Sequence, residues 1–119
     1  MDDDADGLDA LCTYLTKIGH NVDCVPNGKE ALAAVIARPP DLVILDLFMP
    51  EMDGANFLEI IRSYLRLQAL PVIIITGLPD SPMVERARHL RVNTILVKGK
   101  ATLEEIGEAV RQELHRAPN

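Results

Sequence analysis

The sequence predicts a single α/β domain in which a doubly wound parallel sheet is covered by helices on both faces. Short, uninterrupted apolar runs, such as LVIL at 42–45 and VIII at 72–75, alternate with longer segments whose apolar residues recur at helical spacing. Strands buried on both faces form such runs, and their alternation with helices is typical of βαβ units. The length of 119 residues suits one hydrophobic core.

After the first helix, strands and helices are expected to alternate along the chain. In chain order they are a helix over 8–18, a strand over 20–26, a helix over 27–37, a strand over 42–46, a helix over 55–65, a strand over 71–76, a helix over 81–90, a strand over 94–98 and a helix over 102–114. Gly19 is expected to end the first helix, and Pro39 the second, because proline cannot continue a helix. Thr102 and Glu105 form a T-x-x-E capping box that opens the last helix.

Charge and composition exclude several classes of protein. The formal net charge is −6, from 12 basic and 18 acidic residues, which argues against a direct nucleic-acid partner. No apolar run approaches the roughly 18 residues of a membrane span, and no signal peptide is visible, so no membrane association is expected. Cys12 and Cys24 have neither metal-ligand spacing nor the density of a disulfide scaffold, which favours buried thiols in a reducing cytoplasm.

Three chemically reactive side chains lie at the carboxyl ends of predicted strands. They are Asp46, Thr76 and Lys98, and in open parallel sheets functional groups gather at this edge. A carboxylate can attack phosphorus, and carboxylates with phosphate oxygens bind Mg²⁺. A lysine and a threonine hydroxyl suit phosphoryl oxygens. Each residue alone is more often a cap or a solvated group, so the combination carries the argument.

The stretch D-L-F-M-P-E-M-D-G at 46–54 resembles the phosphoacceptor loop of receiver domains of two-component response regulators. Thr76 and Lys98 follow Asp46 at the family's spacings, and the likeness covers nearly the whole chain. It implies a flavodoxin-like fold, with 1–119 as a single receiver domain and no output domain. It also implies a CheY-like regulatory phosphoprotein of the cytoplasm that is not an enzyme, apart from self-catalysed phosphorylation and dephosphorylation.

The resemblance implies a role for each residue of the site. Asp46 would accept a phosphoryl group from a histidine kinase or a histidine phosphotransfer protein and switch a protein-interaction surface. Mg²⁺ would be bound by Asp2, Asp3, Asp46 and the backbone carbonyl of Phe48, with Asp2 acting through water. Thr76 and Lys98 would contact the phosphoryl group, and Gly77 would leave room for it. Ile95 would occupy the switch position.

The chain departs from the family's pattern in three places. Only Met1 precedes Asp2, so the first, central strand is largely missing from this chain. Either the start of the gene is placed too late or the domain is truncated, and for the chain as given we expect lower stability and a dimer or a segment-exchanged oligomer. Gly99 replaces the proline that usually follows the lysine, so we expect no cis bond there and a less rigidly placed Lys98. Ile95 replaces the usual aromatic residue at the switch position.

Two alternatives stay open at this stage. The first is a pseudo-receiver, an interaction module that keeps the fold and Asp46 but is not phosphorylated, because the acidic pair is untethered and Lys98 misplaced. The second is a magnesium-dependent aspartyl-phosphate phosphotransferase or phosphatase. That chemistry wants a second acid two residues after the nucleophile, where this chain has Phe48.

Overall fold

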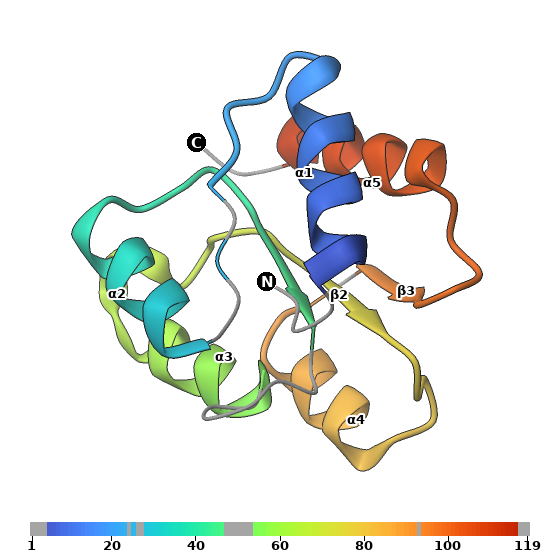
Figure 1. The fold of residues 1–119 in the computed structure, drawn as a ribbon. Helices are drawn as coiled ribbons and strands as arrows, with labels where there is room; N and C mark the ends of the chain where they lie inside the picture. Colours follow the sequence, from blue (N-terminus) through green and yellow to red (C-terminus); the bar gives the residue numbers. More distant parts are fainter. Residues whose placement is uncertain (1–4, 24, 26–27, 47–53, 93, 117–119) are drawn as a thin grey trace.

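The structure is a computed structural model that describes residues 5–23, 25, 28–46, 54–92 and 94–116. From the second helix onward its helices and strands alternate as the sequence predicts (Figure 1). They are α1 (Ala5–Lys17), α2 (Gly28–Ala37), β1 (Val43–Asp46), α3 (Gly54–Ser63), the 3₁₀ turn η1 (Leu65–Leu67), β2 (Val72–Thr76), α4 (Pro82–His89), β3 (Thr94–Val97) and α5 (Leu103–Arg116).

The described sheet consists of three parallel strands in the order β1-β2-β3. The register pairs Asp46 with Ile75 and Thr76 with Val97. All strands run in the same direction, so their carboxyl ends lie at one edge of the sheet. The predicted α/β class with a parallel sheet is confirmed.

Successive residues of the strands face two separate helical layers. Val43 and Leu45 of β1 and Ile74 of β2 pack with α2, α3 and α4, where Phe57 is fully buried. The strand residues between these, which include Ile73, point to the other face of the sheet and pack with α1 and α5. Because side chains alternate across a strand, both faces of the sheet are apolar, which is why these strands are continuous apolar runs in the sequence.

The expected strand over 20–26 is not formed in its described part. Residues 20–23 and 25 have no strand assignment, because an extended segment becomes a strand only when a neighbour pairs with its backbone. A cavity of about 410 Å³ is lined by this segment, by β1 and by helices of both layers, among them Leu15, Val22, Val35, Val43, Ile44 and Val110. The cavity therefore lies beside β1, between the two helical layers.

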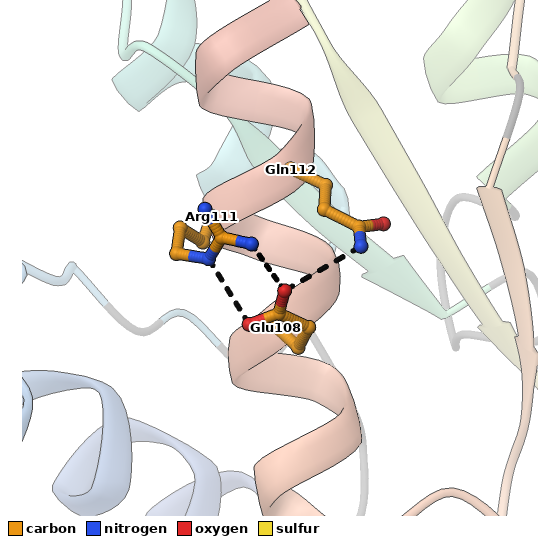
Figure 2. A network of polar contacts seen from close by, with 3 residues as sticks. All are labelled: Glu108, Arg111 and Gln112. Carbon is orange, nitrogen blue, oxygen red and sulfur yellow. Dashed lines mark hydrogen bonds and ion pairs between the residues drawn. The ribbon is translucent and has the colours of Figure 1, made fainter.

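Several local predictions are confirmed at helix ends. Gly19 ends α1 with a φ of +108°, and the N–H of His20 donates to the carbonyl of Leu15 at 3.0 Å. The capping box forms in both directions: the N–H of Glu105 donates to the Thr102 hydroxyl at 3.1 Å, and the N–H of Thr102 donates to the Glu105 carboxylate at 3.0 Å. On the exposed side of α5, Arg111 and Gln112 donate to Glu108 (Figure 2).

Two other expectations need correction. The helix expected over 55–65 ends at Ser63, because Tyr64 adopts an extended backbone with φ −87° and ψ 126° before η1 begins. Cys12 is disulfide-bonded and not a free thiol; Cys24 lies outside the described residues. Pairing of cysteines depends on how closely the fold brings them together, which spacing along the sequence does not reveal. Within the described segments, no helix is long and apolar enough to span a membrane.

Candidate functional site

The three strands deliver three predicted site residues to the carboxyl edge of the sheet. Asp46 is the last residue of β1, Thr76 is the last residue of β2, and Lys98 directly follows β3. Asp46 is only 4% exposed and Thr76 is completely buried, so a carboxylate and a hydroxyl end two strands whose other residues are all apolar.

Asp46 and Lys98 form an ion pair across the site. The Lys98 ammonium Nζ lies 3.0 Å from Oδ2 of Asp46 and donates a hydrogen bond to it. The side chain of Asp46 is 5% exposed, and that of Lys98 is 34% exposed. A buried carboxylate is costly unless a charge or hydrogen bonds compensate it, so the bond from Lys98 offsets part of the cost of burying Asp46.

Thr76 accepts two hydrogen bonds from backbone N–H groups at this edge. Its backbone carbonyl accepts a hydrogen bond of 2.8 Å from the N–H of Lys98. Its hydroxyl oxygen accepts one of 3.1 Å from the N–H of Leu78. A hydroxyl that accepts this bond still has its own proton to donate. Thr76 therefore fixes the backbone of the lysine and keeps a hydroxyl proton at the carboxyl edge of the sheet.

Lys98 leads into a tight turn. The described residues contain no cis peptide bond, as expected at Lys98-Gly99, and Gly99 has a φ of +84°. The N–H groups of Lys100 and Ala101 both donate to the carbonyl of Val97, at 3.1 and 3.0 Å. A left-handed glycine thus turns the chain toward α5 where the family has proline, while Lys98 still reaches Asp46.

The remaining predicted site residues have different surroundings. Gly77 is exposed, and a Cβ built on it would meet nothing within 4 Å, so the space beside it is open. Ile95 lies in β3, opposite Ile74, and packs against the cluster of α2, α3 and α4 away from the strand ends. Asp2, Asp3 and Phe48 lie outside the described residues.

A metal site can therefore be assessed only at Asp46. Among the described residues, no group of three or more His, Cys, Asp or Glu side chains could hold a metal ion. Asp46 supplies a carboxylate oxygen, the type of ligand that Mg²⁺ prefers. The other expected ligands fall outside the described part of the chain.

Sequence reasoning missed the backbone groups of the site. The N–H of Leu78 and the carbonyl of Thr76 hold the hydroxyl and the lysine, respectively. Backbone groups are present at every position, so no residue type marks them. Only the parallel register, in which Thr76 pairs with Val97, places the N–H of Lys98 beside the carbonyl that accepts it.

Comparison with known proteins identifies the family. Residues 1–111 match the response regulator receiver domain. The chain belongs to the family of response regulator receiver domains. It is thus a CheY-like domain of the two-component system type, and the buried aspartate at the end of β1 is the residue that its resemblance implied as the phosphoacceptor.

Individual relatives agree with this assignment. The receiver domain is 31% identical over 111 residues to "Probable chemotaxis protein CheY" of Rhizobium etli, with 92% of this chain and 85% of that protein covered. It is 35% identical over 80 residues to the transcriptional regulatory protein GltR of Pseudomonas aeruginosa, with 67% and 33% covered, so the match spans a third of that regulator's length. The receiver domain of a signal transduction histidine kinase from Syntrophus aciditrophicus has a similar structure, with a TM-score of 0.85 at 28% identity over 97% of this chain and 86% of that one.

Proposed function

We propose that this receiver domain is a phosphoacceptor switch in which Asp46 takes a phosphoryl group from a histidine kinase or a histidine phosphotransfer protein. The observation that carries the proposal is the ion pair of 3.0 Å between Lys98 and the buried Asp46, with the buried Thr76 at the end of the neighbouring strand. In this proposal residues 1–119 act as one receiver domain whose role is regulatory.

In the proposed reaction a carboxylate oxygen of Asp46 attacks the phosphorus of the donor. The new bond joins this oxygen to phosphorus, and the bond between phosphorus and the donor's leaving atom breaks, with its electron pair remaining on the donor. The product is an acyl phosphate on Asp46. Lys98 moves from a carboxylate partner to a phosphoryl partner, and the Thr76 hydroxyl donates to a phosphoryl oxygen.

We further propose that the reaction requires Mg²⁺. Asp46 would bind it together with Asp3 and the backbone carbonyl of Phe48, and Asp2 would act through water. A bound Mg²⁺ ion neutralises the charge of phosphoryl oxygens during transfer. Asp46 is the one member of this set among the described residues, and its oxygen chemistry fits the ion.

The pseudo-receiver alternative was based partly on a misplaced lysine. The distance between Lys98 and Asp46 weighs against that reason, while the position of Asp2 and Asp3 stays a prediction. We propose a cytoplasmic location from the family alone, since the disulfide at Cys12 does not support it. We propose no particular downstream partner.

A kinetic comparison tests the role of the lysine. Phosphoryl uptake from acetyl phosphate with Mg²⁺ is followed over time for the native chain, Lys98→Ala and the matched control Lys100→Ala, whose lysine is exposed just beyond the site. A charge-assisted hydrogen bond contributes about 1.5–3 kcal/mol, so Lys98→Ala should slow uptake by about tenfold to a hundredfold. The control should react at the native rate. Equal rates for Lys98→Ala and the native chain would contradict the proposal.

A further inference from the structure

A small basic and apolar patch lies at the edge of the sheet opposite Asp46. It consists of Arg62, Tyr64, Leu65, Arg66 and Arg91, which lie in or next to η1 or donate to its neighbouring backbone. In Figure 1 this segment connects α3 to β2. Leu65 is 85% exposed and Tyr64 is 40% exposed. η1 precedes β2, and Thr76 is the last residue of β2. The length of this strand, roughly 16 Å, therefore separates the η1 patch from the edge of the sheet that carries Asp46.

Backbone carbonyls, and not carboxylates, hold the arginines of the η1 patch. Arg62 donates to the carbonyls of Leu67, Leu70 and Leu90 at 3.0, 2.8 and 2.9 Å. Arg66 donates to the carbonyl of Ile36 at 2.6 Å, and Arg91 to that of Gln68 at 3.1 Å. Within the described residues, no carboxylate forms an ion pair with these arginines. Backbone carbonyls therefore fix their orientation without an ion pair among the described residues.

The two stretches of sequence that carry the η1 patch contain no acidic residue. Neither 60–79 nor 86–103 contains an aspartate or glutamate, although the whole chain has a net charge of −6. Burial lowers the pKa of Arg62, and the nearby positive charge of Arg91 lowers it further. Arg66 and Arg91 are both exposed. Among the described residues, each guanidinium group donates one hydrogen bond, to a backbone carbonyl, out of the five N–H groups that it carries.

We propose that the η1 patch is a docking surface for an acidic protein segment that carries an apolar side chain. The carboxylates of the segment would pair with Arg66 and Arg91, and its apolar side chain would cover Leu65 and Tyr64. Charge complementarity decides the occupant: the patch is positive on a protein that is otherwise acidic, and fixed guanidinium groups pair well with carboxylates. The exposed leucine favours a protein segment over a purely charged polyanion.

Binding of a short fluorescein-labelled peptide, Glu-Asp-Leu-Phe-Glu-Glu, to the full chain tests this proposal by fluorescence anisotropy. Leu65→Ser should weaken binding by about tenfold, since the apolar contact between Leu65 and the bound peptide is lost. The matched control Leu78→Ser changes a leucine that is 58% exposed at the opposite edge and should bind as the native chain does. Because Leu65 is so exposed, its substitution should leave the melting temperature unchanged.

Charge is tested in the same assay. Arg66→Glu should weaken binding at least as strongly as Leu65→Ser, whereas Arg111→Glu on α5 should not. Raising the salt concentration should also weaken binding, because exposed charges are screened. Equal affinity for a single-stranded RNA oligonucleotide of matched charge would overturn the proposal in favour of general polyanion binding. An affinity that neither Leu65→Ser nor Arg66→Glu changes, or no binding at all, would also overturn it.

Discussion

Gly99→Ala should destabilise the domain, although there is room for the added methyl group. A Cβ at Gly99 would meet nothing within 4 Å, so no steric clash with neighbours contributes. The cost comes from the φ of +84°, which penalises a residue with a Cβ by about 1–2 kcal/mol. Gly77→Ala is the matched control, because Gly77 also has open space around its Cβ but no positive φ. Its expected effect lies within about 1 kcal/mol of zero.

Urea unfolding of both variants measures this difference. For a small domain that loses about 2 kcal/mol of stability per molar urea, Gly99→Ala should lower the midpoint by roughly 0.5–1 M relative to the control. Amine labelling with mass spectrometry then compares Lys98 with Lys100, and Gly99→Ala should increase the labelling of Lys98 by loosening its pair with Asp46. If both variants have the same midpoint, the left-handed turn is not needed to hold this loop.

Further predictions concern α5. Thr102→Ala removes the hydroxyl of the capping box and should cost about 1 kcal/mol, measured as a lower urea midpoint with faster amide exchange in the first turn of α5; unchanged exchange would contradict it. The hydrogen bond from Arg111 lowers the pKa of Glu108 below its ordinary value of 4.5. The stability that this bond contributes is therefore present above pH 4.5 and disappears as the pH falls through the lowered pKa. An NMR titration in which Arg111→Ala leaves the Glu108 pKa unchanged would refute this prediction.

The sequence was most informative where one residue type has one physical use. The alternation of apolar runs and amphipathic segments predicted the helical layers and the parallel sheet. The position of Asp46, Thr76 and Lys98 at strand ends predicted that they share an edge, and Gly19 and Thr102 marked the ends of helices. In each case the cause is local or follows from the direction of the strands.

The sequence was less informative where an interaction depends on a partner far along the chain. The segment 20–26 has the composition of a strand, but its described residues form none, since strand formation needs a paired neighbour. Glu113 lies on the buried side of α5, and the Thr94 hydroxyl donates to it at 2.5 Å. From the sequence alone, an acidic residue in an amphipathic helix is expected to be exposed to solvent. Only the packing of α5 beside β3 reveals that Thr94 is the partner of Glu113.

Intact-mass spectrometry after incubation with acetyl phosphate and Mg²⁺ is the most direct test of the central claim. The native chain and Asp46→Asn are compared, each with a circular dichroism spectrum to establish that it is folded. The account predicts that the mass of the native chain rises by one phosphoryl group and that the mass of the variant stays unchanged. No addition to a folded native chain, or equal addition to both, would contradict it.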